Sequence, residues 1–64
     1  MAVIETRVRG IVRNDVLSGS NQRVLSIGPV IHNRRSVELL TDKGKRRVTA
    51  WNADTTVTVL REVG

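Results

Sequence analysis

The segment RSVELLTDKGKRRVTAWN, residues 35–52, decides the fold, because it predicts a tight β-hairpin. Its arms are Arg35 to Thr41 and Lys45 to Asn52, and apolar residues recur in them at spacing two. The connection Asp42-Lys43-Gly44 is typical of a hairpin turn, since glycine adopts the left-handed conformation that closes such a turn. This segment therefore predicts antiparallel β-structure.

The register of this hairpin decides where Trp51, the sole aromatic residue, points. With Thr41 opposite Lys45, the loop has three residues and Trp51 falls on the apolar face of the hairpin. With Thr41 opposite Arg46, the indole lies outward beside Arg47, where it could stack on a ligand. A three-residue loop suits Asp-Lys-Gly, and large aromatic side chains are usually buried, so we favour the core position.

Three further strands are expected outside the hairpin. They are Val3 to Arg13, one long strand bent at Gly10; Gln22 to Ile31, interrupted at Gly28-Pro29; and Thr56 to Val63. Asn, Asp, Ser and Gly between the first two form turns that bracket a loop holding Val16-Leu17, and His32 to Arg34 form another turn. No window favours a helix. The chain is expected to be one all-β domain, residues 1–64, built as a small five-stranded barrel with short hairpins.

The order of these parts resembles SH3-like small barrels. The shared layout is a long bent first strand, a polar loop, a three-strand meander, one tight turn at Asn52 to Thr55 and a short last strand. The wealth of arginine and the lack of Phe and Tyr also resemble the composition of an accessory protein from an actinobacterium or one of its phages. The resemblance in layout implies a barrel fold, and neither resemblance assigns a role to any residue.

Composition narrows the class of protein. Eleven Lys and Arg against six Asp and Glu give a net charge of +5, which suits a polyanionic partner. The chain has no cysteine and therefore no disulfide, as expected of an intracellular protein. We see no secretory leader and no apolar run long enough for a membrane span. We expect no membrane association and a cytoplasmic location, the host cytoplasm if the protein is viral.

Catalytic chemistry finds no support in the sequence. His32, the sole histidine, is expected to face solvent in a turn. Asp15, Asp42 and Asp54 also fall in turns, where hydrogen bonds from their side chains to the backbone explain them. The glycines follow no nucleotide-binding pattern. We therefore expect a binding protein without catalytic residues, metal or cofactor.

Basic residues form the candidate site. Alternation puts Arg7, Arg9 and Arg13 on one face of the first strand. A second group, at the hairpin turn, is Lys43, Lys45, Arg46 and Arg47, and Arg34 with Arg35 lies at the opposite end of the same strand pair. Guanidinium groups spaced along strands can each neutralise a phosphate, although a solvated face that keeps the protein soluble is the alternative.

Two functions are consistent with these residues. The first is sequence-tolerant binding of nucleic acid, duplex DNA rather than RNA, along a basic face of Arg7, Arg9, Lys45 and Arg47. The second is a small protein-interaction module, such as a phage factor that docks on an acidic host protein or joins an assembly. Either protein is expected to form a homo-oligomer, because so small a core leaves stability marginal.

Overall fold

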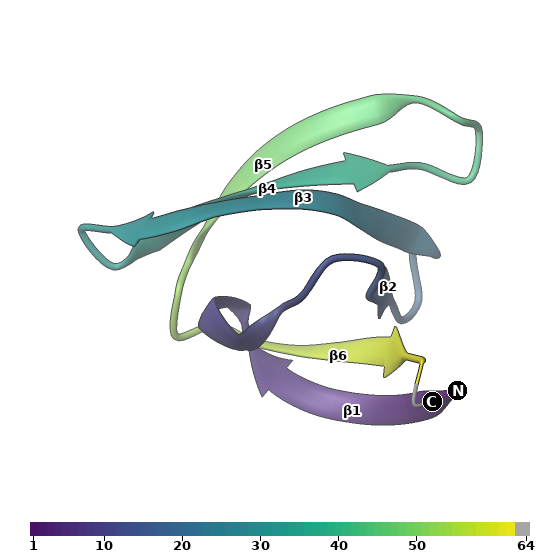
Figure 1. Cartoon of the computed structure of the whole chain (residues 1–64), viewed down its shortest axis with the longest axis horizontal. Coiled ribbons are helices and arrows are strands. Elements are labelled where there is room, and N and C mark those ends of the chain that lie inside the picture. Colours follow the sequence, from purple (N-terminus) through teal and green to yellow (C-terminus); the bar gives the residue numbers. More distant parts are fainter. Residues whose placement is uncertain (63–64) are drawn as a thin grey trace.

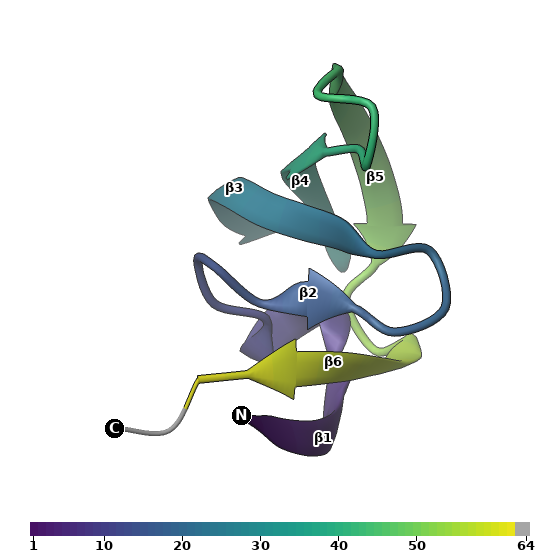
Figure 2. The same cartoon turned by 90° about the vertical axis from the view of Figure 1, so that its right-hand side faces the viewer.

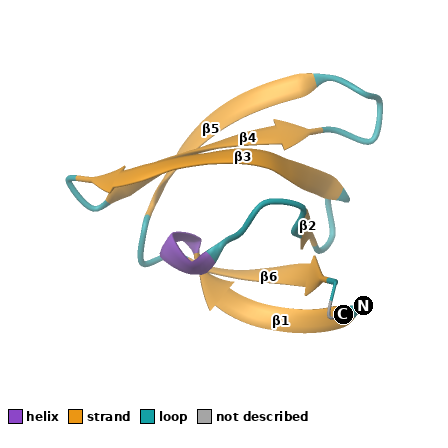
Figure 3. Cartoon of the chain, viewed as in Figure 1, coloured by secondary structure: helices purple, strands orange, loops and turns teal. Residues whose placement is uncertain are grey.

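A computed structural model describes residues 1–62, and their regular structure is a single antiparallel sheet with one short 3₁₀ turn and no α-helix (Figure 1, Figure 3). The elements are β1 (Ala2–Arg7), η1 (Val8–Gly10), β2 (Val16–Leu17), β3 (Gln22–Ile31), β4 (Arg34–Leu40), β5 (Arg46–Asn52) and β6 (Thr56–Arg61). The strand order is β1-β6-β2-β3-β4-β5. The all-β prediction is confirmed; the sheet has six strands rather than five and is open, with β1 and β5 at its edges.

The sheet folds over on itself into two layers. Strands β3, β4 and β5 form one layer, β1 and β6 form the other, and β2 joins them (Figure 1, Figure 2). The main core cluster between the layers consists of five buried side chains: Val8, Ile11, Val24, Val37 and Leu39. Four partly buried side chains pack against this cluster: Leu17, Ile27, Trp51 and Val57.

The β4–β5 hairpin has the first of the two registers considered above. The Thr41 amide donates to the Lys45 carbonyl at 2.8 Å, and the Gly44 amide donates to the Thr41 carbonyl at 3.0 Å. Gly44 has a φ of 77°, the left-handed conformation that the three-residue loop requires. Trp51 consequently points inward and is half-buried against the core.

The expectation of one long strand from Val3 to Arg13 is wrong. β1 ends at Arg7, and the chain then turns through η1, where the Val8 amide donates to the Thr55 carbonyl at 2.9 Å. Val8 and Ile11 are both buried, which a regular strand with one buried face does not achieve at a spacing of three. Arg7, Arg9 and Arg13 therefore do not share a strand face.

The prediction that Val16-Leu17 lies in a loop is also wrong, because these two residues form the strand β2. β2 pairs with β3 on one side and with β6 on the other, and so connects the two layers. Two apolar residues are too few to show alternation, so the pattern could not identify this strand. The last strand ends at Arg61, and the expected end at Val63 lies outside the described residues.

The third strand has the predicted bounds and the predicted interruption. The β3–β4 register shifts between Ile27 and Val30, around Gly28-Pro29. The turn that follows is shorter than expected: it contains only His32 and Asn33, both with positive φ, and Arg34 already begins β4. His32 is exposed, as predicted. This turn and the turn before β6 lie at the same end of the molecule, opposite the β4–β5 turn (Figure 1).

Candidate nucleic-acid interface

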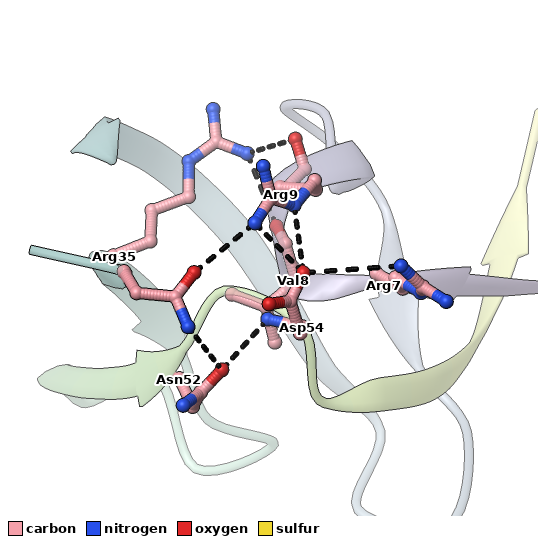
Figure 4. A network of polar contacts seen from close by, with 7 residues as sticks. Arg7, Val8, Arg9, Arg35, Asn52 and Asp54 are labelled. Carbon is pink, nitrogen blue, oxygen red and sulfur yellow. Dashed lines mark hydrogen bonds and ion pairs between the residues drawn. The ribbon is translucent and has the colours of Figure 1, made fainter. Parts of the chain in front are cut away.

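Arginines at one end of the molecule are held by the fold. The network of Arg9, Asn33, Arg35, Asn52 and Asp54, here called the packed end, joins η1 to the two neighbouring turns (Figure 4). Arg9 donates to Asp54 Oδ1 from Nε at 3.0 Å and from Nη2 at 2.7 Å, and its Nη2 also donates to Asn33 Oδ1 at 3.1 Å. Arg9 therefore serves the fold through polar contacts with neighbouring turns.

The turn that supports this network has the local chemistry expected of it. Asn52 Oδ1 accepts from the Asp54 amide at 2.9 Å, and the Thr55 amide donates to the Asn52 carbonyl at 3.1 Å. Asn52 thus forms the side-chain turn that the sequence Asn52 to Thr55 suggested. The Asp54 carboxylate, by contrast, accepts from Arg9 instead of from the local backbone.

Arg35 has a different role, since it satisfies backbone carbonyls. Its Nε donates to Gly28 O at 2.9 Å, and its Nη1 lies within hydrogen-bonding distance of Val8 O, Arg9 O and Ile11 O at 3.1, 2.8 and 3.3 Å. The side chain is half-buried beneath η1. Since backbone oxygens occupy this guanidinium, Arg35 stabilises the 3₁₀ turn and offers little to an external phosphate.

Asp54 is the acid of the packed end. The hydrogen bonds from Arg9 lower the pKa of Asp54 below its ordinary value, since they favour the charged carboxylate. Arg7 lies near the same oxygen, with Nη1 at 3.9 Å from Asp54 Oδ1. One carboxylate thus offsets two arginines that the sequence assigned to a phosphate-binding face.

A second arginine is held by a buried acid. Arg61 donates to Asp15 from Nε at 3.0 Å and from Nη2 at 2.8 Å, and the Asp15 side chain is only 1% exposed. Burial by itself raises the pKa of Asp15, but the hydrogen bonds from Arg61 and the Val12 amide outweigh it, and the pKa is lowered. The predicted turn hydrogen bond of Asp15 is present, at 3.1 Å from the Val12 amide, whereas no local pattern indicated Arg61 as its partner.

The cations at the opposite end are free. Lys43, Lys45, Arg46 and Arg47 surround the β4–β5 turn, and within the described residues none of their side chains donates a hydrogen bond or enters an ion pair. This turn stands at the top of Figure 2, away from β1 and β6. All four side chains are exposed, so their charge is available to a partner.

Arg23 belongs to the same group, which the sequence did not reveal. It pairs with Leu40 across β3 and β4, and Leu40 pairs with Arg46 across β4 and β5, so the three form one row. Strands are spaced by about 4.8 Å, which places the Arg23 and Arg46 backbones about 10 Å apart. We define the hairpin cluster as these five residues: Arg23, Lys43, Lys45, Arg46 and Arg47.

The hairpin cluster carries cations on both faces of the ribbon. Arg46 lies on the outer face with Arg23, whereas Arg47 pairs with Leu39 and lies on the inner face beyond the core. Two acidic residues lie near the hairpin cluster, one in the sequence and one in the strand register. Asp42 is exposed in the turn, and Glu38, one row further along the outer face, is 3.4 Å from the Ser26 hydroxyl, within hydrogen-bonding distance.

The remaining predicted residues are dispersed. Arg34 is exposed at the start of β4 and donates from Nη2 to the Ala50 carbonyl at 3.2 Å. Arg13 is exposed in the loop before β2, beside the Asp15–Arg61 pair. The structure therefore brings the turn cations together with Arg23. It places the other four arginines where β1 ends, in η1 and where β4 begins: Arg7, Arg9, Arg34 and Arg35. That end of the sheet lies opposite the β4–β5 turn (Figure 1). The single basic face of Arg7, Arg9, Lys45 and Arg47 does not form.

The described side chains contain no group of three or more metal-ligating residues. Within residues 1–62, no helix has the length and apolar character needed to cross a membrane. Comparison of the chain with protein-family models, with curated proteins and with solved structures finds no significant match to any of them.

Proposed function

We propose that this protein is a small non-catalytic nucleic-acid binder that contacts phosphates with the hairpin cluster. The observation that carries this proposal is the gathering, at one end of the β4–β5 ribbon, of five cations that have no partner within residues 1–62. Each phosphate contact releases condensed counterions, so several cations on one short ribbon bind a polyanion together. The interface is thus smaller than a whole basic face and lies around one turn.

The shape of the ribbon favours duplex DNA over duplex RNA. A two-stranded β-ribbon fits the major groove of B-form DNA, which is about 12 Å wide. The major groove of A-form RNA is deep and narrow, and side chains cannot read it. Cations on both faces of the β4–β5 ribbon can reach the phosphates on both sides of a wide groove. Contacts of these side chains with phosphates carry no sequence information, so the proposed binding is sequence-tolerant.

The same proposal includes the fold family and origin suggested by the sequence. The β3-β4-β5 meander, the tight turn at Asn52 to Thr55 and the short last strand support kinship with SH3-like small barrels. An actinobacterial or phage accessory role in the cytoplasm agrees with the arginine-rich composition. Neither assignment gives a role to an individual residue.

The test compares two triple variants of equal charge. Lys43→Gln, Lys45→Gln, Arg47→Gln removes three cations from the hairpin cluster, and Arg7→Gln, Arg13→Gln, Arg34→Gln removes three exposed cations elsewhere. Both variants are titrated with duplex DNA, duplex RNA and heparin at several salt concentrations, after circular dichroism shows that each is folded. Equal loss of net charge makes any difference between them a matter of position.

The hairpin variant is expected to lose affinity for duplex DNA in all sequences. If all three residues touch phosphate, the slope of log affinity against log salt shrinks by nearly three, because each contact releases about 0.9 counterion. The control variant is expected to change the slope by less than about one unit through its long-range field alone. Equal effects of both variants, or no binding of DNA by the wild type, would overturn the proposal.

The second candidate, a protein-interaction module, uses the same cations on an acidic protein surface. It predicts that the hairpin cluster binds an acidic polypeptide more tightly than duplex DNA at the same salt concentration. Polyglutamate serves as the probe in a parallel titration. A preference for polyglutamate that the hairpin variant loses would make the interaction module the better assignment.

A further inference from the structure

The free edge of β5 is a second feature of the molecule that the hairpin cluster does not explain. β5 is the last strand in the sheet order, so one of its sides has no neighbour in the described sheet. Its seven residues pair with β4 in one unbroken register, from Arg34 opposite Asn52 to Leu40 opposite Arg46. The strand is therefore regular along its whole length, which is the form that best accepts another strand.

The free backbone groups of β5 follow from the phase of the ladder. The Thr41 amide donates to the Lys45 carbonyl, so Lys45 and every second residue after it face β4. Val48 and Ala50 consequently turn their amides and carbonyls outward, together with Arg46 and Asn52. The carbonyls of Ala50 and Asn52 agree with this phase, since they accept from the Arg34 side chain and the Thr55 amide and not from backbone amides of β4.

The middle of the β5 edge lacks the devices that usually protect an edge strand. Residues 48–51 contain no proline, glycine, lysine or bulge, and Val48 is 71% exposed. β1, the other edge, also exposes an apolar residue, Val3 at 70%, but carries Glu5 and Arg7 on its exposed face. Protection on β5 comes from Arg46 and Arg47 at its start and from the Arg34 side chain, which donates to the outward Ala50 carbonyl at 3.2 Å. The short apolar stretch between these charged groups suits a partner strand of matching pattern.

We propose that β5 pairs with β5 of a second copy of this chain, antiparallel and centred on Thr49. Full overlap of the seven-residue strand with its copy puts its middle residue on the two-fold axis. Val48 then lies opposite Ala50 of the second copy, and both turn their amides and carbonyls toward the other strand, so four backbone hydrogen bonds form at about the spacing of an ordinary ladder. The Ala50 carbonyl, which also accepts from Arg34 Nη2 at 3.2 Å, uses its second lone pair for this contact. This interface does not depend on nucleic-acid binding.

Charge selects this arrangement over others. Antiparallel overlap places Arg46 opposite Asn52 of the second copy and Arg47 opposite its Trp51, where a guanidinium can stack on the indole. The two hairpin clusters then lie at opposite ends of the joined strands, with the two Lys45 residues offset by about 26 Å along them. Parallel pairing would set Arg46 and Arg47 beside their own copies, and like charges directly opposite are destabilising. Self-pairing in the antiparallel sense is thus complementary in charge.

The first test measures association of the full chain. Sedimentation equilibrium from micromolar to millimolar protein is expected to show a monomer–dimer equilibrium. The sole indole, Trp51, lies half-exposed on β5, so its fluorescence maximum is expected to shift to the blue as the dimer forms. A chain that remains monomeric at millimolar concentration, or a dimer whose formation leaves the Trp51 emission unchanged, would overturn the inference.

The second test uses two lysine substitutions matched in exposure and charge. Val48→Lys adds a cation to the β5 edge, and Val3→Lys adds one to the β1 edge, at positions 71% and 70% exposed. In the antiparallel dimer the two substituted side chains at position 48 are diagonal neighbours, about 7–8 Å apart, and Arg46 lies close to them. Val48→Lys is therefore expected to weaken dimerisation by at least about tenfold, whereas Val3→Lys has no effect beyond the general charge effect.

Ala50→Pro provides a second block that adds no charge. The Ala50 amide faces outward, so proline removes an edge donor and leaves the β4 ladder intact. A folded Ala50→Pro protein, checked by circular dichroism, is expected to be monomeric. If Val48→Lys and Ala50→Pro both dimerise like the wild type while Val3→Lys does not, the contact lies at β1 and the inference is wrong.

Discussion

The two ends of this small sheet use arginine in opposite ways. At the packed end, Arg9 and Arg35 direct their donors to Asp54, Asn33 and backbone carbonyls. At the hairpin cluster, the cations have no partner within residues 1–62. The same residue type therefore holds the fold at one end and is available to a ligand at the other. Net charge alone does not distinguish these roles, because only the local acceptors differ.

The largest change in stability is expected from removal of Arg35, which tests whether the two ends of the sheet differ. Arg35→Met leaves the carbonyls of Gly28, Val8 and Arg9 without this donor beneath η1. The Val8 carbonyl keeps the Ile11 amide as a donor at 3.2 Å, and the Arg9 carbonyl is exposed to water, so the main loss is at the part-buried Gly28 carbonyl. A part-buried acceptor without a partner costs about 1–3 kcal/mol, so the free energy of unfolding is expected to fall by about 2–3 kcal/mol in total. Urea denaturation measures the change. Arg47→Met at the free end is the control and is expected to change stability by less than about 0.5 kcal/mol. Equal effects of the two substitutions would show that the ends do not differ.

Acid is expected to weaken the ion pairs that hold Arg9 and Arg61, because their partners are carboxylates. The cations of the hairpin cluster have no such pair within residues 1–62 to lose. The pKa of Asp15 is lowered in the fold by Arg61 and the Val12 amide, against the opposing effect of burial. A carboxyl whose folded pKa lies below its unfolded value, near 3.9, stabilises the protein above that pH and loses this contribution as the pH falls further. The free energy of unfolding should therefore be steady down to about pH 5 and decline below about pH 4.

Asp15→Asn isolates the contribution of this carboxylate. The substitution removes the charge that Arg61 holds and is expected to cost on the order of 2 kcal/mol at pH 7, as for a hydrogen bond to a charged group. The variant should then lose less stability than the wild type between about pH 5 and pH 2. Denaturation at a series of pH values measures both effects. An unchanged decline in the variant would assign acid sensitivity to other groups, such as Asp54.

Local chemistry explains which parts of the fold the sequence could predict. The hairpin register follows from the Asp42-Lys43-Gly44 turn, and the interruption of β3 follows from Gly28-Pro29, because each depends on neighbouring residues. The β4 and β5 boundaries differ from the predicted ones by a single residue. In contrast, η1 depends on carbonyl partners from distant turns and on Arg35, which no local pattern encodes.

The candidate site was predictable only where its residues are consecutive. Lys43, Lys45, Arg46 and Arg47 form one run, so the sequence identified them as a group. Arg23 joins them through two strand pairings, and a reader of the sequence would need the β3–β4 register to find it. The assignment of Arg9 to the phosphate-binding face is wrong for the complementary reason, because its partner Asp54 is 45 residues away in the sequence. Long-range pairing thus both removed and added members of the site.

Gly44 offers a smaller test, directed at the turn that presents the hairpin cluster. Its φ of 77° costs an L-residue with a side chain about 1–2 kcal/mol, so Gly44→Ala should lower stability by about that amount. No heavy atom lies within 4 Å of a Cβ placed there, so the cost is conformational and not steric. Gly44→Asn should recover part of the loss, because asparagine tolerates this conformation. Thermal denaturation of the two variants compares them; equal losses would argue against a left-handed turn.

The smallest expected effect concerns the stability of the hairpin variant itself. Lys43→Gln, Lys45→Gln, Arg47→Gln removes no hydrogen bond or ion pair found in residues 1–62, so its free energy of unfolding should stay within about 0.5 kcal/mol of the wild type. The sign of this small change in the free energy of unfolding follows from the repulsion among the cations, which depends on salt concentration. Cations about 10 Å apart repel one another at low ionic strength and are screened at about 0.1 M, where the Debye length is about 10 Å. The wild type should therefore gain slightly in stability as salt is added, and the variant should gain less. A loss above about 1 kcal/mol would mean that these cations have partners in the folded chain, and the contrast between the two ends would then disappear.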